Sequence, residues 1–484
     1  MELYHENIMN NFNRIYMVGI KGFGMASLAY LLKKMGRKVS GSDVDETFPT
    51  DILLNEAGIR ALIGFRAENI SDDIDLIITT GAHGGLHNPE VLAGKQKGIP
   101  IMTHAEALGK LMDGFKHKIA ICGTHGKTTT SALLAFVLHH LGMPLGYQVG
   151  TPSFSGMLGG DFTGTDYFVV ESDEYVASPG IDNTPRFMFQ NPDFILCTNI
   201  DYDHVDVYKD LHAVKEAFYE FFMKSRVRPF ISFFRDDMNA RSVVERSGIS
   251  ALSYGFSSQA DAQISSVAVK DGRTFFSLAI YGKDYGSYAI SIPGQHNVAN
   301  AVGVLTILYA LGIDLDKARP ILSQFTGSKR RFELLFESEK YILIDDYAHH
   351  PHELEALMQG ARSLYPHKRL ILLFQPHTYS RTQALKSEFA QALRSADLTY
   401  VLDIFSSARE NSEDYSINAE QLVQAAQAED QRKGSYSIKY IRTDSAISSL
   451  AQDMLPGDII ITAGAGDIYK LHPAIIEMLK SRQR

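Results

Sequence analysis

A short run rich in glycine and threonine, at positions 123 to 129, is the part of the sequence best suited to chemistry. It lies between an apolar stretch typical of a strand and a stretch typical of a helix, so backbone N–H groups and the helix N-terminus can hold phosphates there. Lys127 would neutralise the outer phosphates, and the Thr128 hydroxyl would face Mg²⁺. A full Walker motif has glycine where Ile121 stands, so an ordinary strand-to-helix turn is the alternative. The run consists of Gly123, Thr124, His125, Gly126, Lys127, Thr128 and Thr129.

Two residues near the ends of predicted strands are candidate metal ligands. Glu171 closes the apolar run 166–171, with Asp173 and Glu174 just beyond it, and His204 follows the next predicted strand. Magnesium takes oxygen ligands, and open α/β sheets place their sites at the carboxyl ends of strands. A solvated acidic turn and a structural histidine are the alternatives for these positions.

A second glycine turn, from Gly19 to Gly24, follows a predicted strand and opens a predicted helix. Its spacing is G-x-x-G-x-G, whereas the dinucleotide fingerprint is G-x-G-x-x-G. Asp43 ends the next predicted strand and could bind a ribose hydroxyl. The pattern favours a diphosphate ligand over simple helix-to-sheet packing, without identifying the nucleotide.

Polar residues between the second and third predicted units could contact a nucleotide. Asn297 and Asn300 are three apart on a predicted helix and share one face, from which their amides could reach a base. Helix capping by Asn297 is the alternative. Arg330 and Arg331 could clamp phosphate, or they could form a solvated pair.

The third unit carries two polar segments, 345–351 and 374–382, and each follows a predicted strand. Polar groups beyond the carboxyl ends of neighbouring strands form a plausible pocket for a small zwitterion. The adjacent His349 and His350 could instead bind zinc, but no cysteines or acidic residues at matching spacing accompany them. The sequence therefore disfavours a zinc site here.

The elements that must position these residues form three alternations of strand and helix. This rhythm predicts an α/β protein with an N-terminal Rossmann-like domain, a central P-loop-type ATPase domain with added strands, and a C-terminal Rossmann-like domain. We expect the domains to span residues 1–112, 113–328 and 329–484, where each alternation restarts.

Composition limits the class of protein. The chain has 484 residues, which is too long for one ordinary core, and 45% of them are hydrophobic. The formal net charge of −9 argues against a protein that mainly binds nucleic acid. No apolar run approaches the roughly 18 residues that cross a bilayer, and no signal layout opens the chain. We expect a cytoplasmic protein without a membrane partner, with Cys122 and Cys197 as buried thiols; the sequence does not give the oligomeric state.

Taken together, the motifs resemble those of the Mur ligases over essentially the whole chain. The resemblance implies an N-terminal domain for a UDP-sugar, a central ATPase domain, and a C-terminal domain that closes to bring in the amino acid. The matching segments, in order, are GIKGFGM, SGSD, GTHGKTTT, ESDE, TNIDYDH, GQHNVANA, GSKRRFE, DDYAHHP, FQPHTYSRT and DIFSSARE.

The resemblance also implies a role for each matched residue. The catalytic group would be Lys127, Glu171, His204 and Arg331, and Thr128, Glu171 and His204 would bind Mg²⁺, or Mn²⁺ in its place. ATP would contact the run 123–129 together with Asn297, Asn300, Arg331 and Asp346. The UDP-sugar would contact Gly19, Gly22, Phe23, Gly24, Met25, Ser42 and Asp43. The amino acid would contact Tyr347, His350, His377 and Arg381.

The implied reaction joins L-alanine to the lactyl carboxylate of UDP-N-acetylmuramate through an acyl phosphate, in peptidoglycan precursor synthesis. Tyr175 and the long connection after it instead resemble the branch that attaches the recycled tripeptide L-Ala-γ-D-Glu-meso-diaminopimelate. The segment 79–90 also departs from the usual family pattern. An inactive nucleotide-binding regulator and a dehydrogenase are the remaining alternatives, and the incomplete dinucleotide spacing disfavours the second.

Overall fold

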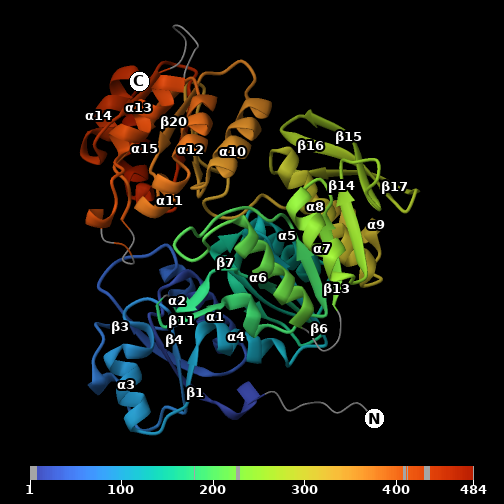
Figure 1. Ribbon diagram of the computed structural model, residues 1–484, viewed down its shortest axis with the longest axis vertical. Helices are drawn as coiled ribbons and strands as arrows, with labels where there is room; N and C mark the ends of the chain where they lie inside the picture. Colours follow the sequence, from blue (N-terminus) through green and yellow to red (C-terminus); the bar gives the residue numbers. More distant parts are fainter. Residues whose placement is uncertain are drawn as a thin grey trace.

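The computed structural model describes residues 8–178, 180–224, 229–406, 410, 412–429 and 437–482. Figure 1 shows the first domain (blue) below, the C-terminal domain (orange and red) above it, and the middle domain (cyan to yellow) beside both. Each domain is built on its own sheet with helices on both faces. The expected fold of three α/β domains is confirmed.

The first domain is a parallel sheet in the order β3-β2-β1-β4-β5. Its strands are β1 (Arg14–Val18), β2 (Lys38–Asp43), β3 (Leu62–Ile63), β4 (Leu76–Thr79) and β5 (Ile101–Thr103), and its helices are α1 (Phe23–Lys34), α2 (Asp51–Glu56), α3 (Pro89–Gln96) and α4 (His104–Met112). The central strands are apolar and buried on both faces, as parallel strands between two helix layers must be.

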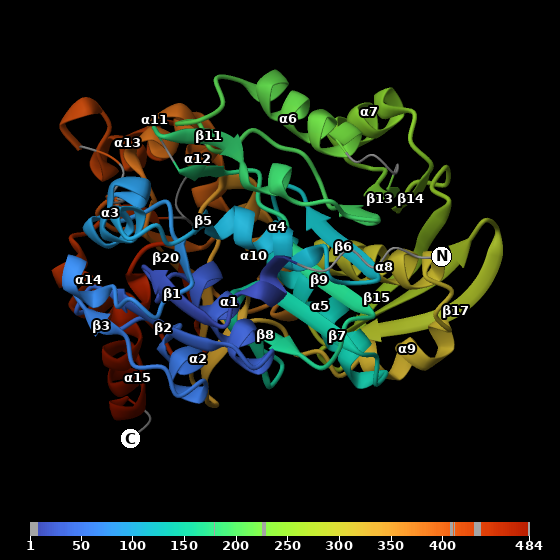
Figure 2. The same cartoon turned by 90° about the horizontal axis from the view of Figure 1, so that it is seen from below.

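The middle domain has a ten-stranded sheet, in the order β17-β16-β15-β14-β13-β12-β6-β9-β7-β8. Its strands are β6 (His117–Cys122), β7 (Leu145–Phe154), β8 (Met157–Phe162), β9 (Tyr167–Glu171), β12 (Phe194–Cys197), β13 (Phe230–Phe234), β14 (Ala251–Gly255), β15 (Ala262–Lys270), β16 (Arg273–Ile280) and β17 (Lys283–Ile290). The antiparallel strands β15 to β17 are the added strands, and β15 and β17 extend away from the first domain (Figure 2). A separate hairpin of β10 (Val176–Ser178) and β11 (Asp182–Pro185) lies beyond β9.

Helices cover both faces of this sheet. One apolar core contains α5 (Lys127–His140), α8 (Gln295–Ala310) and α9 (Leu315–Leu322). The opposite face packs on α6 (Leu211–Lys224) and α7 (Met238–Ser247), in a core that continues into the first domain. Cys122 and Cys197 lie opposite each other on β6 and β12, and both are buried free thiols, as expected.

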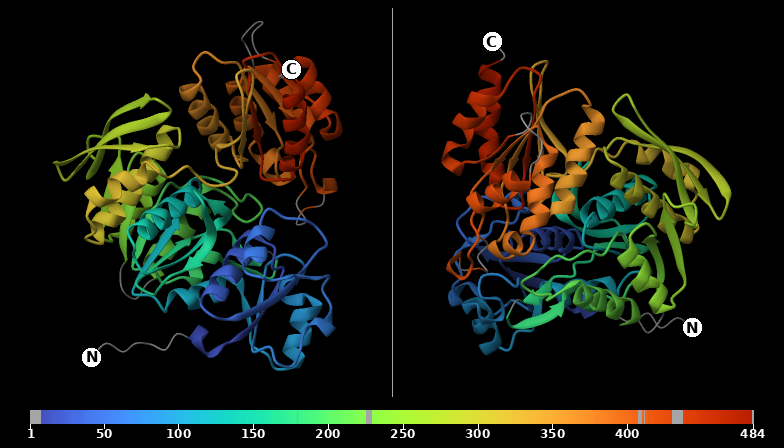
Figure 3. Two further views of the ribbon diagram at one scale, coloured as in Figure 1. Left: turned by 180° about the vertical axis from the view of Figure 1, so that it is seen from behind. Right: turned by 45° about the horizontal axis from the view of Figure 1, so that its top comes forward.

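The C-terminal domain has the sheet order β18-β19-β23-β20-β21-β22, with only β18 antiparallel among the described strands. Its strands are β18 (Glu333–Glu337), β19 (Ile342–Asp346), β20 (Leu370–Phe374), β21 (Leu398–Val401), β22 (Ser437–Tyr440) and β23 (Ile459–Ala463). Its helices are α10 (Pro351–Leu364), α11 (Tyr379–Ala384), α12 (Lys386–Ala392), α13 (Ala419–Glu429), α14 (Ala446–Asp453) and α15 (His472–Ser481). Figure 3 shows this domain above the first domain (blue) in both views, with the yellow strands of the middle domain at its side.

Close backbone contact joins the first and middle domains where α1 crosses β7 and β8. The Ser27 hydroxyl donates to the carbonyl of Val149, 3.1 Å away. A Cβ at Gly160 would lie 2.4 Å from the Ser27 carbonyl oxygen, so only glycine lets the helix approach this closely. The glycines of β8 therefore fix how the first domain sits on the middle one.

We propose domain boundaries near residues 112 and 328. Helix α4 ends at Met112 and β6 begins at His117, while α9 ends at Leu322 and β18 begins at Glu333. Within the described residues, no helix is both long and apolar enough to cross a membrane.

Replacing Leu134 by alanine tests the packing that holds α5, the helix that carries Lys127. Leu134 is fully buried in the middle-domain core, so we expect Leu134→Ala to cost about 2–5 kcal/mol and to lower the thermal midpoint measured by circular dichroism. The control Leu455→Ala removes a side chain that is 54% exposed and should change stability by less than about 0.5 kcal/mol. Equal midpoints for the two variants would contradict this packing.

Candidate active site

The glycine-rich run forms a tight turn between β6 and α5. Gly123 has φ +127° and Gly126, the N-cap of α5, has φ +83°, conformations that side chains of L-residues rarely adopt. A Cβ at Gly123 would also lie 2.1 Å from the Thr198 hydroxyl oxygen. Lys127 and Thr128 therefore stand at the first turn of a buried helix, where its free N–H groups favour anions.

Lys127 lies over its own loop. Its Nζ donates to Glu174 Oε2 at 2.7 Å, to the Gly123 carbonyl at 2.6 Å and to the Thr124 carbonyl at 3.1 Å. Burial opposes the charge on this ammonium, but the carboxylates of Glu174 and Asp173 outweigh burial and raise its pKa. The amine is therefore a fixed positive charge at the mouth of the loop.

Oxygen ligands gather beside Lys127. The Thr128 hydroxyl donates to Glu171 Oε1 at 2.9 Å, and the Gly150 N–H donates to Glu171 Oε2 at 2.8 Å. Burial raises the pKa of Glu171. The ligand atoms of Asp173, Glu174 and His204 all lie within 4.8 Å of one another.

Two features of this group fit a bound cation. Glu174 Oε1 is buried and has no hydrogen-bond partner among the described residues, which is an arrangement that needs an explanation in a native protein. His204, whose Nε2 is 3.6 Å from that oxygen, has φ +53°, a conformation rare outside glycine and found at functional sites. The group of Asp173, Glu174 and His204 therefore suits a cation, and metal binding by the predicted ligands Thr128, Glu171 and His204 stays a prediction.

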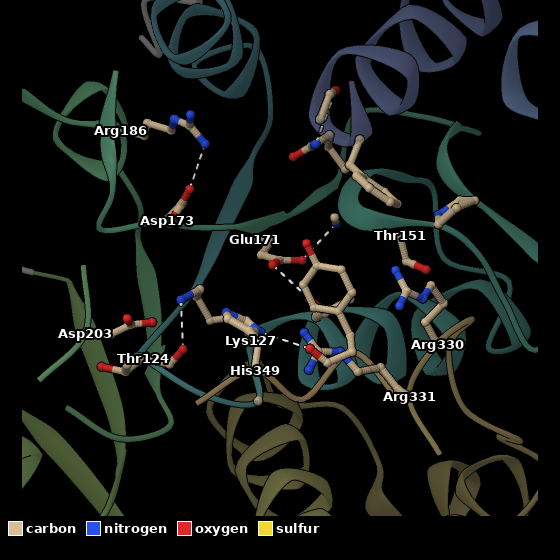
Figure 4. Close-up of a pocket in the computed structure, with 18 of the residues that line it drawn as sticks. Thr124, Lys127, Thr151, Glu171, Asp173, Arg186, Asp203, Arg330, Arg331 and His349 are labelled. Atoms are coloured by element: carbon tan, nitrogen blue, oxygen red, sulfur yellow. Dashed lines mark hydrogen bonds and ion pairs between the residues drawn. The ribbon is translucent and has the colours of Figure 1, made fainter. Parts of the chain in front are cut away.

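All three domains line one cavity of about 330 Å³ beside the loop. Phe23 and Gly24 come from the first domain, and Tyr347 and His349 come from the third. Figure 4 shows Lys127 and Glu171 in the middle of this cavity, with the pair Asp173–Arg186 on one side and Arg330 and Arg331 on the other. The ring centroids of Phe23 and Tyr347 are 6.4 Å apart, so the outer domains touch across it.

A second cavity, of about 240 Å³, lies on the other side of the loop. It is lined by Asn297 and Asn300 on α8 and by Asp346 at the end of β19. The Asn297 amide donates to the Pro293 carbonyl at 2.6 Å, and the Asn300 amide donates to Asn297 Oδ1 at 3.2 Å. Burial raises the pKa of Asp346 to about 6, although two backbone N–H groups donate to it.

The two cavities adjoin each other at the loop. Gly126, Arg331 and Glu353 line both of them. Glu353, which the sequence analysis missed, lies 3.7 Å from Arg331 Nη1 and 3.4 Å from His125 Nδ1. The spacing of His350 and Glu353 is that of a capping box, the one local signal that could have identified it. A ligand that fills both cavities would therefore cross the phosphate loop.

The paired arginines have different surroundings. Arg330 Nε donates to Asp345 Oδ2 at 3.0 Å, and its Nη2 donates to the Gly464 carbonyl at 2.6 Å, so it fastens the C-terminal sheet. Arg331 lines both cavities, and its guanidinium interacts electrostatically with the nearby carboxyl groups of Glu353 and Asp346.

The residues predicted for the UDP-sugar divide into two groups. Phe23 and Gly24 line the larger cavity, and Gly22 caps α1. The others are held within the domain: Gly19 turns with φ +75°, Met25 is buried, the Ser42 hydroxyl donates to Glu90, and Asp43 accepts from the Lys21 N–H at 2.7 Å. Contacts of this second group with a ligand stay a prediction.

The residues predicted for the amino acid also divide. Tyr347 lines the larger cavity, whereas Arg381, with 6% of its surface exposed, donates from Nε to Asp203 Oδ1 at 2.7 Å. His377 stacks on Phe405, and His350 lies against the Tyr202 carbonyl. Arg381 and His350 thus join the C-terminal domain to the middle one, whereas His377 packs within the C-terminal domain, and the contact of all three with an amino acid stays a prediction. Residues 407–409 of the DIFSSARE motif lie outside the described residues.

Other cavity residues had no clear signal in the sequence. His104 is half-buried at the start of α4, and its buried Nε2 has no hydrogen-bond partner among the described residues. Burial lowers its pKa to about 4. Burial opposes the charge on Asp173, but Arg186, 2.8 Å away, together with Lys127 and His204 outweighs burial and lowers the pKa of this carboxyl to about 2. These residues come together only in the folded chain.

Comparison with known proteins identifies the family. Three domain models match in order: "Mur ligase family, catalytic domain" over residues 14–116, "Mur ligase middle domain" over 121–308, and "Mur ligase, glutamate ligase domain" over 330–466. A UDP-N-acetylmuramate–L-alanine ligase of Desulfitobacterium hafniense is 34% identical over 467 residues, 96% of this chain and 99% of the relative. The chain belongs to the Mur ligase family. The expectation of an ATP-dependent ligase that joins an acid to an amino acid is confirmed.

Other relatives agree with this membership. A protein of the same name from Lactiplantibacillus plantarum is 37% identical over 401 residues, 83% of this Mur ligase and 87% of the relative. The crystal structure of a UDP-N-acetylmuramate-alanine ligase from Thermotoga maritima matches with a TM-score of 0.77 and 25% identity, covering 97% of this chain and 99% of that one. A murein peptide ligase from Psychrobacter arcticus, at 22% identity, shares the fold with a TM-score of 0.69 over 96% and 98% of the two chains.

Removing the ammonium of Lys127 tests the phosphate loop. We expect Lys127→Ala to lower kcat by about 100-fold or more while the circular dichroism spectrum stays unchanged, because a charge facing the transferred phosphate is lost. Lys209→Ala, which removes a side chain that is 80% exposed, is the control and should keep full activity. A folded Lys127→Ala enzyme with near-normal turnover would rule out this role.

Replacing Glu171 tests the metal ligands. Glu171→Gln keeps the size of the side chain but removes its charge, so we expect the Mg²⁺ concentration for half-maximal activity to rise. The matched control is Glu245→Gln on the surface of α7, where the side chain is 59% exposed. A loss of rate that excess Mg²⁺ does not relieve at all would indicate a different role for Glu171.

Proposed function

We propose that this Mur ligase joins L-alanine to the lactyl carboxylate of UDP-N-acetylmuramate, with cleavage of ATP to ADP and phosphate, in peptidoglycan precursor synthesis. The observation that carries the proposal is the cavity beside the phosphate loop, which residues of all three domains line. Such a cavity can hold a sugar nucleotide from one side, a nucleoside triphosphate from the second and an amine from the third. Both substrates carrying phosphate are cytoplasmic metabolites, so we place the enzyme in the cytoplasm.

ATP binding would use both cavities. The nucleoside would occupy the smaller one, against Asn297, Asn300 and Asp346, and the phosphates would cross the loop toward Lys127. The γ-phosphate would then enter the larger cavity between Lys127 and Arg331. Fixed positive charges of this kind stabilise the oxygens of a phosphoryl group during transfer.

The metal site would hold Mg²⁺ through Thr128, Glu171 and His204, and Mn²⁺ could take its place. The ion would neutralise charge on the ATP phosphates. The chain itself fixes these ligands, because Glu171 accepts from the Gly150 N–H and Thr128 stands in the first turn of α5.

The chemistry has two steps. An oxygen of the lactyl carboxylate attacks the γ-phosphorus, ADP leaves, and an acyl phosphate forms. The amine of L-alanine then attacks the acyl carbon, the bond from that carbon to the phosphate oxygen breaks, and inorganic phosphate leaves with that oxygen. Both steps require reacting atoms held in contact, which a cavity shared by three domains provides.

The choice of L-alanine rests on the named relatives and on the C-terminal segments FQPHTYSRT (374–382) and DIFSSARE (403–410), which resemble those of the alanine-adding branch of the family. The feature that favoured the tripeptide, Tyr175, is buried, and its hydroxyl donates to Asp206 at 2.7 Å. The hairpin that follows it packs on the first domain, where a Cβ at Gly81 would lie 2.5 Å from the Ala177 carbonyl oxygen. Tyr175 lines neither cavity, so it gives little support for a tripeptide.

One experiment separates the candidate activities. The purified enzyme is given ATP, Mg²⁺ and UDP-N-acetylmuramate together with L-alanine, glycine, L-serine or the tripeptide L-Ala-γ-D-Glu-meso-diaminopimelate, and phosphate release and product mass are measured. We expect the highest kcat/KM with L-alanine. Preference for the tripeptide would replace this proposal with the recycling reaction, and no turnover with any acceptor would favour a nucleotide-binding regulator.

Arg381 tests the placement of the amino acid. If Arg381 also pairs with the substrate carboxylate, Arg381→Lys should raise the KM for L-alanine by about tenfold, or roughly 1.4 kcal/mol, and barely change the KM for ATP. Asp203→Asn removes its partner within the protein and serves as the comparison. A fall in kcat and thermal stability in both variants, with the KM for L-alanine unchanged, would show that Arg381 only fastens the two domains.

A further inference from the structure

Three histidines and an aspartate meet between the middle and C-terminal domains, outside the group proposed for magnesium. His125 lies in the phosphate loop, Asp201 follows β12, and His350 and His352 stand at the start of α10. One ligand atom from each lies within 4.8 Å of the other three. This is a cluster of three nitrogen ligands and one oxygen ligand.

The oxygen of Asp201 is the centre of the cluster. Its Oδ2 lies 3.1 Å from His125 Nε2, 2.5 Å from His352 Nδ1 and 3.8 Å from His350 Nδ1. In a tetrahedral zinc site with bonds of about 2.0–2.2 Å, neighbouring ligand atoms are roughly 3.3–3.6 Å apart. The three distances to Asp201 Oδ2 therefore differ from those of a tetrahedral site by about an ångström or less.

The remaining ring nitrogens of the two buried histidines are held from behind. His350 Nε2 lies 3.2 Å from the Tyr202 carbonyl, which can only accept, so Nδ1 carries the lone pair; Nδ1 accepts a long hydrogen bond, 3.4 Å, from the His352 N–H, which metal binding would replace. His125 Nδ1 lies 3.4 Å from Glu353 Oε1, which leaves Nε2 facing Asp201. Histidines that bind metals have this arrangement, in which a carbonyl or carboxylate fixes the tautomer and the ring.

The composition of the cluster selects the class of ion. Imidazole nitrogens suit zinc and similar transition metals, whereas magnesium prefers oxygen ligands and is served by the group around Glu171. The cluster also has a route to solvent, because the His352 side chain is 60% exposed while His350 is 3% exposed. The partners of His350 and His352 are His125 and Asp201, which lie about 150 to 225 positions earlier in the chain. A rule based on local sequence spacing could not identify them.

We propose that His125, Asp201, His350 and His352 form a binding site for Zn²⁺ or a transition-metal ion of similar preference. Two ligands come from each domain, so the site is complete only when the C-terminal domain is closed on the middle one. A bound ion would hold the phosphate loop to the N-terminus of α10. The site is distinct from the ligands proposed for the catalytic magnesium and does not depend on the proposed substrate.

The test uses the full chain with any affinity tag removed and with millimolar Mg²⁺ present to occupy the oxygen-rich group. Co²⁺ is titrated first, and we expect visible absorption of the intensity typical of a tetrahedral site, which Zn²⁺ then abolishes by displacement. Calorimetry should give one Zn²⁺ per chain. His352→Asn removes an exposed ligand and should weaken Zn²⁺ binding by at least about 10- to 100-fold, the cost of losing even an outer partner of a metal site.

The matched control is His212→Asn on α6, whose side chain is 75% exposed and lies outside the cluster. It should bind Zn²⁺ as the unaltered protein does. Asp201→Asn provides a second test, with thermal denaturation to show that it folds and that Zn²⁺ no longer raises its midpoint. Absence of Zn²⁺ uptake by the unaltered protein, or equal affinity in the His352→Asn and His212→Asn variants, would overturn the proposal.

Discussion

The glycine turn between β6 and α5 is the constraint on which the rest of the site depends. Its two left-handed glycines place the start of a buried helix at the carboxyl edge of the ten-stranded sheet. From there Lys127 and Thr128 reach the acidic groups that follow β9, and His125 reaches the third domain. A helix N-terminus in this position favours anions before any side chain contributes.

The contacts between the C-terminal and middle domains complete the site around the glycine turn. Arg381 pairs with Asp203 across the interface, while Glu353 at the start of α10 approaches both His125 and Arg331. These buried charges would be costly to leave unpaired, so the closed arrangement and the polar contacts depend on each other. The same contacts bring the C-terminal lining of the larger cavity to the phosphate loop.

Local patterns were enough to predict the three α/β domains and the turn that holds Lys127, because strand, glycine turn and helix follow one another directly in the chain. They could not predict which distant groups meet. The partner of Lys127 is Glu174, and the partner of Arg381 is Asp203, and neither pairing has a sequence spacing that reveals it. Zinc binding by His349 and His350 was disfavoured because no cysteines or acidic residues accompany them at matching spacing; the residues that meet His350 and His352 in the structure, His125 and Asp201, lie in another domain.

We propose that the carboxylate is activated by direct phosphoryl transfer in the cavity that the three domains share. The most direct measurement uses UDP-N-acetylmuramate labelled with ¹⁸O in the lactyl carboxylate, with ATP, Mg²⁺ and L-alanine, and mass spectrometry of the released phosphate. An acyl phosphate requires one carboxylate oxygen to leave with phosphate, so we expect one ¹⁸O in each phosphate formed. Phosphate without the label, released at the rate of ligation, would contradict it.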